Sequence, residues 1–418
     1  MSWNWEYKGY GINGNFHKIK SQHFQDVSPF DLKKVNTIWG EEPALVDEAV
    51  SAAKNAQSKW FKLSLEERTK KFLSFAAEVE KRSEEIAQAI CNSTGKTITE
   101  CRGELKAVAR KNKLTVEKGL DLVKTVYASG GEYQFHPLGV ISIVGPFNFP
   151  VHLINSHVAP ALLLGNTVVI KGSENCPAVS QLYYEASLSS ELPPGAINIV
   201  QGGPIIGDKL VSHPDVFGVV FTGSYRVGKK IKESCLNSPN KLLALEMGGK
   251  NFCVIDEDAD IELAAKEISA AVLGGAGQKC SATSRVLAHK KLADKLLGQI
   301  KIQFEAVTQV DPRKDNSKMG TLVNDQAARS FLAYQESIKT TNSEIILEGN
   351  RPDDSSCFVR PALRKVYDSK DPIFFEEVFG PDLSFETFSD YDSVFPTLND
   401  NPYGLCLSFF GQSKTKNP

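Results

Sequence analysis

The sequence of 418 residues lacks several features that would assign it to a specialised class of protein. It has almost no net charge, because 48 Lys and Arg residues oppose 50 Asp and Glu residues. No global electrostatic attraction therefore draws the chain to nucleic acid or to an anionic lipid surface. It has no internal repeat and no low-complexity segment, and 41% of its residues are hydrophobic, as in ordinary globular proteins. We expect about two to three domains.

The chain also lacks the sequence features of secreted and disulfide-bonded proteins. None of its eight cysteines forms a Cys-x-x-Cys pair, and the opening residues MSWNWEYKGY contain no apolar run that could serve as a secretory signal. Thiols in the cytoplasm stay reduced. We therefore expect a cytoplasmic protein without disulfides, and we expect no metal site.

No uninterrupted apolar segment is long enough for a membrane span. The stretch between Glu132 and Lys171 has no Asp, Glu, Lys or Arg, but four prolines and three histidines interrupt it. A spanning helix needs about 20 predominantly apolar residues. We interpret this stretch as the buried core of a soluble fold and expect no membrane partner.

The hydrophobic pattern changes along the chain. From Val46 to about Val126 it has the periodicity of amphipathic helices, and Ser64 with Glu67 matches a capping box. Short β-branched runs then alternate with helical segments. Strands are predicted at 139–144, 167–170, 197–200, 218–221 and 252–255, and near 285–288 and 344–347. Apolar strands with long connections predict a doubly wound parallel sheet, followed by a second α/β region from about Gly274.

Two motif matches lie in the wrong structural context. Residues 9–14 spell the Gly-x-Gly-x-x-Gly dinucleotide fingerprint, but no strand precedes them. The acidic residues of 256–267 have the spacing of a calcium-binding loop, but Ile261 replaces the glycine of its sharp turn. We predict instead that these acids cap the next helix.

A third match, residues 223–230, is more informative. It follows a predicted strand and resembles a phosphate-binding loop, but Lys230 replaces the Ser or Thr that would bind magnesium. A nucleoside triphosphatase is therefore disfavoured. A helix that begins with small residues can still bind a phosphate group through its N–H groups, and a dinucleotide pyrophosphate would fit.

Three residues are candidates for catalysis. Cys280 follows the glycine-rich segment 274–279, where backbone N–H groups and Lys279 could lower the pKa of its thiol. Glu246 lies at the end of an apolar run, where partial burial could raise its pKa towards that of a general base. Asn148 lies between two prolines after a strand and could donate to an oxyanion. Taken alone, each could also be a structural residue.

Six motifs in chain order resemble those of the NAD(P)-dependent aldehyde dehydrogenase superfamily. They are GPFNFP at 145–150, KGSE at 171–174, FTGS at 221–224, LEMGG at 245–249, GQKC at 277–280 and EEVFGP at 376–381. The resemblance covers nearly the whole chain. It implies an aldehyde dehydrogenase-like α/β fold with a parallel-sheet NAD-binding domain, an α/β catalytic domain and a protruding β-hairpin.

The resemblance also implies residue roles. Cys280 would be the nucleophile, Asn148 and the Cys280 backbone N–H would bind the oxyanion, and Glu246 would activate the hydrolytic water. Cofactor-binding residues would be Lys171 and Glu174 at the adenosine ribose, Gly223, Ser224, Val227 and Gly228 at the pyrophosphate, and Glu377 with Phe379 at the nicotinamide ribose. A carboxylate at position 174 favours NAD over NADP, because it would repel a 2′-phosphate.

Two stretches, 152–162 and 192–203, resemble the branch of this family that oxidises N-succinylglutamate 5-semialdehyde in arginine degradation. That substrate carries several carboxylates, so Lys279 and Arg285 are expected to bind it, with His152 and His157 as weaker candidates. The chain departs from the branch at Lys250, where asparagine is expected. A broad-specificity or other semialdehyde dehydrogenase is the alternative.

The predicted domains are an NAD-binding domain at 1–122 and 138–247, an oligomerisation hairpin at 123–137, and a catalytic domain at 248–418. Family members continue beyond this point with a segment that lines the substrate tunnel and a strand that pairs with a partner subunit, so we expect the catalytic domain to be incomplete here. A homo-oligomer is possible. A remnant that binds NAD but catalyses little is the competing hypothesis, because misplaced reacting groups lose activity.

Overall fold

The computed structural model describes residues 5–21, 24–368, 370 and 372–412. The chain divides into two compact units: residues 1–27, 34–93 and 101–247 form the first, and residues 28–33, 94–100 and 248–418 form the second. The short segments 28–33 and 94–100, which the sequence analysis placed in the NAD-binding domain, therefore belong to the second unit.

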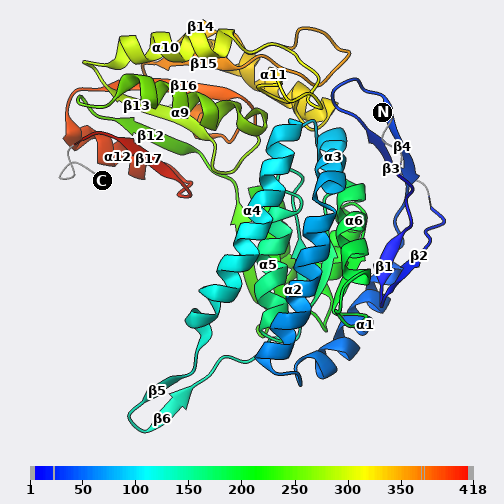
Figure 1. The fold of residues 1–418 in the computed structure, drawn as a ribbon. Helices are drawn as coiled ribbons and strands as arrows, with labels where there is room; N and C mark the ends of the chain where they lie inside the picture. The colour runs from blue at the N-terminus through cyan, green and yellow to red at the C-terminus, as the bar shows by residue number, and fades with distance from the viewer. Residues whose placement is uncertain (1–4, 22–23, 369, 371, 413–418) are drawn as a thin grey trace. The chain divides into compact units, whose positions relative to one another are not determined.

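The first unit is built on a seven-stranded sheet with the order β11-β10-β7-β8-β9-β1-β2 (Figure 1). Its five parallel strands are β7 (Val140–Val144), β8 (Thr167–Lys171), β9 (Ile197–Val200), β10 (Gly218–Gly223) and β11 (Leu242–Met247). The predicted doubly wound topology is confirmed, but the strand predicted at 252–255 belongs to the second unit, which therefore begins before Gly274. The chain runs outward from β7 to β9 and then returns to the other side of β7, so the direction of strand addition reverses between β7 and β10.

Helices cover both faces of this sheet. They are α1 (Ala44–Trp60), α2 (Leu65–Lys81), α3 (Ser83–Thr94), α4 (Ile98–Glu117), α5 (His152–Leu163), α6 (Pro177–Leu188), α7 (Pro204–Ser212) and α8 (Tyr225–Ser234), with a 3-10 turn at Gly119–Val123. The predicted capping box starts α2, because the N–H of Glu67 donates to Ser64 Oγ at 3.2 Å and the N–H of Ser64 donates to Glu67 Oε2 at 2.7 Å.

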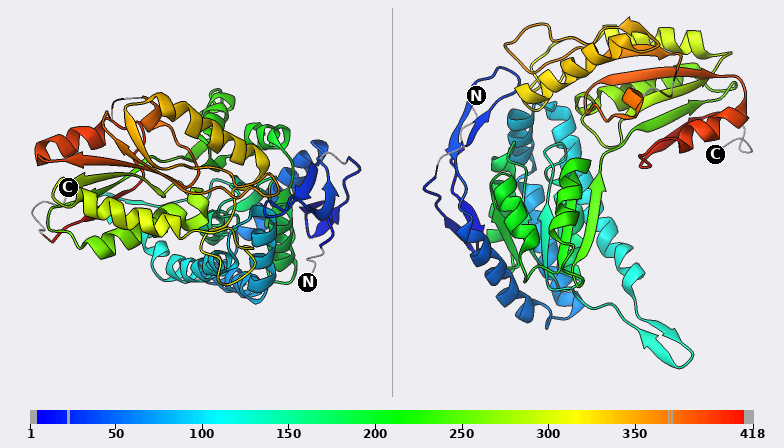
Figure 2. Two further views of the ribbon diagram at one scale, coloured as in Figure 1. Left: turned by 90° about the horizontal axis from the view of Figure 1, so that it is seen from above. Right: turned by 180° about the vertical axis from the view of Figure 1, so that it is seen from behind.

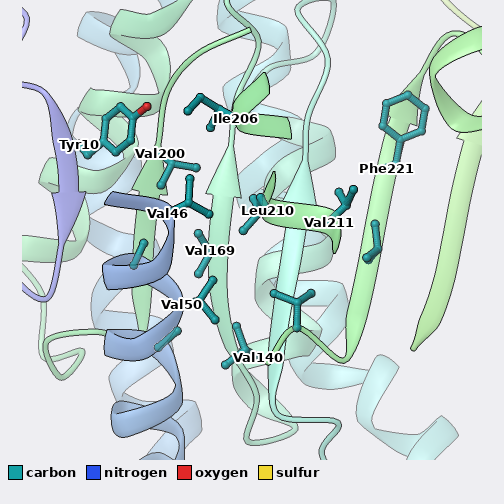
Figure 3. Close-up of a cluster of buried hydrophobic side chains, with 14 of the residues drawn as sticks. Tyr10, Val46, Val50, Val140, Val169, Val200, Ile206, Leu210, Val211 and Phe221 are labelled. Carbon is teal, nitrogen blue, oxygen red and sulfur yellow. The ribbon is translucent and has the colours of Figure 1, made fainter. Parts of the chain in front are cut away.

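The main core of the first unit lies between the sheet and helices α1 and α7 (Figure 3). Val46 and Val50 of α1 and Leu210 of α7 are fully buried against strand residues such as Val169 and Val219. β-branched residues occupy consecutive strand positions because both faces of the sheet are covered. This packing fixes the strand ends at which the candidate site residues lie.

The N-terminal residues form hairpins. β1 (Tyr10–Ile12) pairs antiparallel with β2 (Asn15–His17), and β3 (Phe24–Val27) pairs with β4 (Lys34–Trp39). The Gly-x-Gly-x-x-Gly match is therefore the turn of a hairpin, in which Asn13 and Gly14 have φ values of 51° and 85°. A further hairpin of β5 (Val126–Ala128) and β6 (Gly131–Tyr133) lies within the predicted segment 123–137 and extends from the first unit (Figure 2).

The second unit has a six-stranded sheet with the order β14-β15-β16-β13-β12-β17. Its strands are β12 (Asn251–Ile255), β13 (Thr283–His289), β14 (Ser343–Leu347), β15 (Ala362–Val366), β16 (Asp382–Phe388) and β17 (Leu407–Phe410), all parallel except β14. The helices are α9 (Ile261–Leu273), α10 (Ala293–Glu305), α11 (Asp325–Ser337) and α12 (Val394–Asn399), with 3-10 turns at Gly274–Gly277, Ile338–Thr340, Pro372–Phe375 and Tyr391–Ser393.

The acidic segment before α9 has the predicted capping role. The Asp260 carboxylate accepts from the N–H groups of Glu262 and Leu263 at 3.0 and 3.1 Å, and so starts the helix. Within the described ranges, no helix has both the length and the hydropathy needed to cross a membrane.

Candidate active site

Most candidate residues of the first unit lie at the carboxyl edge of its parallel sheet. Near the carboxyl ends of the strands, Val144 of β7 pairs with Lys171 on one side and with Phe221 on the other. Glu246 pairs with Thr222 at the same level of the sheet. In doubly wound sheets, ligands bind at this edge where the strand order reverses. The sheet therefore brings the cofactor-binding candidates to the reversal between β7 and β10.

Asn148 lies in the loop that connects β7 to α5. Its side chain is buried, and its Oδ1 accepts from the N–H of Phe149 at 3.0 Å, so the amide nitrogen is the donor end of the side chain. Glu104 secures the far end of this loop, because its Oε1 accepts from the N–H groups of Val151 and His152 at 3.0 and 3.1 Å. The loop is thus held at the start of α5 by a buried carboxylate.

Lys171 and Glu174 form an ion pair at the end of β8. Lys171 Nζ lies 3.0 Å from Glu174 Oε2, and the lysine side chain is buried. Burial favours a higher pKa for Glu174, but the Lys171 ammonium and hydrogen bonds outweigh it and lower the pKa. The carboxylate is thus ionised and can accept hydrogen bonds from hydroxyl groups. A Cβ at Gly172 would lie 1.9 Å from Ser180 Oγ, so the serine hydroxyl would have to turn away from any larger residue at this position.

Gly223, Ser224, Val227 and Gly228 form the turn from β10 into α8. Ser224 caps the helix, with its hydroxyl accepting from the N–H of Val227 at 3.4 Å. A Cβ at Gly228 would lie 2.2 Å from Met247 Sδ, so glycine allows α8 to pack against β11. Val227 is 37% exposed, which leaves the first turn of the helix accessible to a phosphate group.

Glu246 lies on β11, at the edge of the sheet, and is exposed. The partial burial expected at the end of this apolar run is therefore not found. His157 of α5 lies close enough to interact electrostatically with this carboxylate. Burial lowers the pKa of His157, and the Glu246 carboxylate opposes that shift in part. A carboxylate with access to solvent can accept a proton from a water molecule, as a general base requires.

In the second unit, Cys280 follows an unusual backbone turn. Gly275, Ala276 and Gly277 have φ values of 62°, 53° and 73°, which lie in the left-handed region. The Gln278 side chain stabilises the turn, because its amide donates to the carbonyls of Gly275 and Thr321 at 3.0 and 3.2 Å. Left-handed residues other than glycine persist only where the surroundings hold them, and they concentrate at functional sites.

The surroundings of Cys280 differ from those of the other thiols. The side chain of Cys280 has intermediate exposure and that of Cys406 is exposed, whereas the remaining six cysteines are buried. The Asn251 amide donates to the Cys280 carbonyl at 2.7 Å and to the Ala282 carbonyl at 2.9 Å. Burial raises the pKa of Cys253, for example, to about 12. An accessible thiol in a fixed loop is better suited to nucleophilic attack.

Gly248 and Gly249 bring Cys280 and Glu377 to one place in the second unit. The N–H of Gly249 donates to Glu377 Oε1 at 2.8 Å, and a Cβ at Gly249 would lie 2.1 Å from the Cys280 carbonyl oxygen. Burial raises the pKa of Glu377. Phe379, two residues further on, has a left-handed φ of 51°.

The loop before Cys280 also packs directly on the segment that follows Glu377. A Cβ at Gly277 would lie 2.1 Å from the carbonyl oxygen of Gly380, next to Phe379. The second unit therefore holds the segment that contains Cys280 close to the segment that contains Glu377 and Phe379.

The prediction for Arg285 needs correction. Its side chain is 1% exposed, and its Nε and Nη2 donate to Glu386 Oε1 at 2.8 and 2.6 Å. The guanidinium also stacks on the rings of Phe252 and Phe375 at 4.4 and 5.3 Å. Since its charge is matched by a core carboxylate, Arg285 is a structural residue and not a substrate-binding one.

Lys279 also has a carboxylate nearby. Its Nζ lies 3.9 Å from Glu100 Oε1, and the side chain folds back over Gly274, where a Cβ would lie 2.3 Å from Nζ. Burial lowers the pKa of Lys279, whereas Glu100 opposes and Lys96 adds to that shift. Of the two predicted substrate cations, only Lys279 has a partly exposed side chain.

Sequence reasoning missed the residues that hold the site in place. These are Glu104, which holds the Asn148 loop, and Asn251 and Gln278, which hold the loop of Cys280. His157, expected only as a weaker substrate contact, lies near Glu246 instead. Each is an ordinary polar residue inside a helix, strand or loop. None of them had a detectable signal: Glu104, for example, stands between Arg102 and Lys106 in a helix rich in charged residues.

Comparisons with known proteins show the family and the fold of the chain. The model of the Aldehyde dehydrogenase family matches residues 16–417. N-succinylglutamate 5-semialdehyde dehydrogenase of Ectopseudomonas mendocina (strain ymp) is 32% identical over 415 residues, which are 97% of this chain and 84% of that protein. A solved aldehyde dehydrogenase from Bartonella henselae superposes with a TM-score of 0.93 at 26% identity, covering 98% of this chain and 88% of the other.

Another solved relative carries bound ligands. A mutant of P. syringae indole-3-acetaldehyde dehydrogenase, in complex with NAD+ and IAA, has a TM-score of 0.91 and 26% identity, over 98% of this chain and 85% of that one. The expected aldehyde dehydrogenase fold is confirmed. The family match spans nearly all of the chain, and the residues of its motifs lie at the edges and loops described above. The chain belongs to the aldehyde dehydrogenase family, whose members are oxidoreductases that act on aldehydes.

Proposed function

We propose that this protein oxidises N-succinyl-L-glutamate 5-semialdehyde to N-succinyl-L-glutamate with NAD. The observation that carries the proposal is the 32% identity with a succinylglutamate semialdehyde dehydrogenase over 97% of the chain. The motif stretch 152–162, which forms helix α5 directly after the Asn148 loop, points to the same branch of the family.

The residues present suit NAD as the cofactor. The exposed first turn of α8 can bind a pyrophosphate, the ionised Glu174 beside Lys171 can accept from ribose hydroxyls, and Glu377 can bind the second ribose. The negative charge of Glu174 disfavours the 2′-phosphate of NADP. When bound, NAD supplies the acceptor for the hydride that leaves the aldehyde carbon.

In the first chemical stage, the Cys280 thiolate attacks the aldehyde carbonyl. A carbon–sulfur bond forms, and the electron pair of the C=O bond moves to the oxygen, which gives a thiohemiacetal anion on Cys280. The Asn148 amide and the backbone N–H of Cys280 donate to this oxyanion and so stabilise the charge that develops in the transition state. After loss of the hydride, a thioester on Cys280 remains.

In the second stage, Glu246 removes a proton from water, and the water oxygen attacks the thioester carbon. The carbon–sulfur bond breaks, the acid is released, and the sulfur leaves as the thiolate. Because a general base for hydrolysis is available, we expect the free acid as product. An acyl-CoA product would contradict this assignment.

Lys279 is the remaining candidate for binding the substrate carboxylates. If its ammonium binds them, Lys279→Glu will raise KM for the succinylated substrate more than KM for a neutral aldehyde, since the new charge repels only the first. The measurement is steady-state NADH formation with both substrates. Equal changes in both KM values would contradict this role.

The experiment that tests the proposed function compares three aldehydes. NADH formation is followed by absorbance with N-succinylglutamate semialdehyde, succinic semialdehyde and a simple aliphatic aldehyde, with Cys280→Ala as control. We expect kcat/KM to be highest for the succinylated substrate and no turnover in the variant. Similar values for all three would favour a broad-specificity aldehyde dehydrogenase. NAD binding without any turnover would favour the competing hypothesis, a remnant that binds NAD but catalyses little.

We further propose that the hairpin within residues 123–137 mediates contact with a second copy of the chain. Its apolar side chains are exposed: Val126 by 57%, Tyr127 by 78%, Tyr133 by 59% and Phe135 by 50%. Clustered exposed apolar residues of this kind commonly mark interaction sites.

A further inference from the structure

Glu100 lies in the first turn of α4, and its two carboxylate oxygens bind different parts of the second unit. Oε2 accepts from the N–H and the hydroxyl of Thr97 at 3.3 and 3.0 Å, and Thr97 Oγ1 in return accepts from the N–H of Glu100 at 3.3 Å. This capping box fixes the carboxylate. Oε1 then accepts from the N–H of Gly275 at 2.6 Å, in the loop before Cys280.

The Gly275 hydrogen bond lies at the start of a backbone conformation that L-residues disfavour. Gly275 and Ala276 have φ values of 62° and 53°, and Ala276 is fully buried. A left-handed alanine brings its Cβ close to the following carbonyl, so outside contacts must hold it. A charge-assisted bond from a buried amide to a carboxylate is among the stronger hydrogen bonds. Glu100 therefore stabilises the turn that presents Cys280.

The same oxygen also faces the residue before the nucleophile. Lys279 Nζ lies 3.9 Å from Glu100 Oε1. The positive charge of Lys96 repels the Lys279 ammonium, so Glu100 attracts an ammonium that another lysine repels. The lysine side chain lies over Gly274, at the other end of the turn. One carboxylate thus contacts the turn at Gly275 and attracts the side chain of Lys279, four residues apart.

We infer that Glu100 is a positioning residue for Cys280, acting through the N–H of Gly275 and the ammonium of Lys279. This inference rests on the proposed role of Cys280 as nucleophile. Displacement of a reacting group by about 1 Å can lower the rate by about 100-fold. We expect Glu100→Ala to lower kcat by about 10- to 100-fold with every aldehyde, while KM changes by less than about threefold.

The test combines kinetics with a direct readout of the loop. Glu100→Ala is compared with Glu100→Gln, which keeps one acceptor oxygen for Gly275 and should recover most of the lost kcat. The rate of Cys280 alkylation by iodoacetamide and hydrogen–deuterium exchange of residues 271–283 report the loop itself. We expect altered alkylation and faster exchange in Glu100→Ala, at a temperature where the variant is folded.

The matched control is Glu117→Ala at the other end of α4, where an exposed glutamate lies 3.8 Å from Lys113. If Glu100→Ala does not fold, Thr97→Ala replaces it in the same measurements. This variant removes the hydroxyl that holds Glu100 Oε2 and leaves the Glu100 carboxylate in place, so we expect a smaller loss of kcat. Wild-type kcat and alkylation in Glu100→Ala, or equal losses in Glu117→Ala, would overturn the inference. Full activity of Cys280→Ser would instead refute the nucleophile assignment.

Discussion

At the scale of single residues, identity alone did not distinguish reactive from structural side chains. Cys280 and Arg285 lie in one short segment. The glycine-rich approach at 274–279 points to Cys280, whereas Arg285 is a candidate only as a cation close to it. Cys280 is accessible, but Arg285 is buried against Glu386. The local sequence contains no information on which carboxylate a strand residue meets across a sheet, because Glu386 lies on the neighbouring strand β16.

The Arg285 correction leads to a stability prediction. Glu386→Gln leaves the buried guanidinium without its counter-charge, so we expect a loss of about 3 to 5 kcal/mol in the free energy of unfolding. KM should change equally for succinylated and neutral aldehydes. Urea unfolding measures the first effect. The control is Glu305→Gln on α10, an exposed pair with Lys301 at 3.8 Å, which should change stability by less than about 1 kcal/mol. A selective KM change for the succinylated substrate would restore a substrate role.

Asp26 provides a pH-dependent prediction. Burial raises the pKa of Asp26 to about 6, although the Ser93 hydroxyl donates to it at 2.9 Å. The folded state therefore holds the proton more tightly than the unfolded state. Protonated Asp26 therefore contributes fully to the free energy of unfolding below about pH 4, and this contribution is lost as the pH rises to about 6.

Asp26→Asn keeps an acceptor for Ser93 but cannot ionise. As the pH rises from about 4 to about 6, we expect the free energy of unfolding of the variant to exceed that of the wild type by an increasing amount. Above about pH 6 the difference should level off at about 3 kcal/mol. Urea unfolding at several pH values measures the difference. A difference that does not depend on pH would show that ionisation of Asp26 is not responsible.

At the scale of helices and strands, the sequence predicted element type and order well. The apolar runs at 140–144, 167–171 and 218–223 are strands of one sheet, and their ends place Asn148, Lys171 and Gly223 at its carboxyl edge. The Glu100 and Glu104 contacts could not be predicted, because they join residues more than 40 positions apart in the chain. Hydrophobic periodicity reports burial, not the partner of a buried polar group.

The packing of α8 on β11 predicts how a substitution in α8 affects NAD binding. In Gly228→Ala the new Cβ would lie 2.2 Å from Met247 Sδ, so the start of α8 has to move away from the sheet. We expect NAD binding to weaken by about 10-fold or more, because the N–H groups of the first turn shift with the helix. Isothermal titration with NAD measures the change. Unaltered affinity would place the pyrophosphate elsewhere.

At the scale of the whole molecule, two units carry different parts of the proposed chemistry: the first holds Asn148 and Glu246, and the second holds Cys280 and Glu377. The exposed hairpin is the candidate contact to another copy. If it mediates assembly, Tyr127→Asp should shift the oligomer towards the monomer, since a charge is costly in an apolar interface. Analytical ultracentrifugation measures the mass. The control is Ile302→Asp on α10, where the side chain is 67% exposed, and an equal shift in that variant would contradict the prediction.

The central claim is that Cys280 carries the acyl group and Glu246 drives its release. It is tested most directly by mass spectrometry of Glu246→Gln after incubation with NAD and the aldehyde, with Cys406→Ala added as a control for the other accessible thiol. We predict one burst of NADH and one acyl group per chain on the peptide that contains Cys280. Steady turnover without an adduct, or an acyl group on a different residue, would contradict the account.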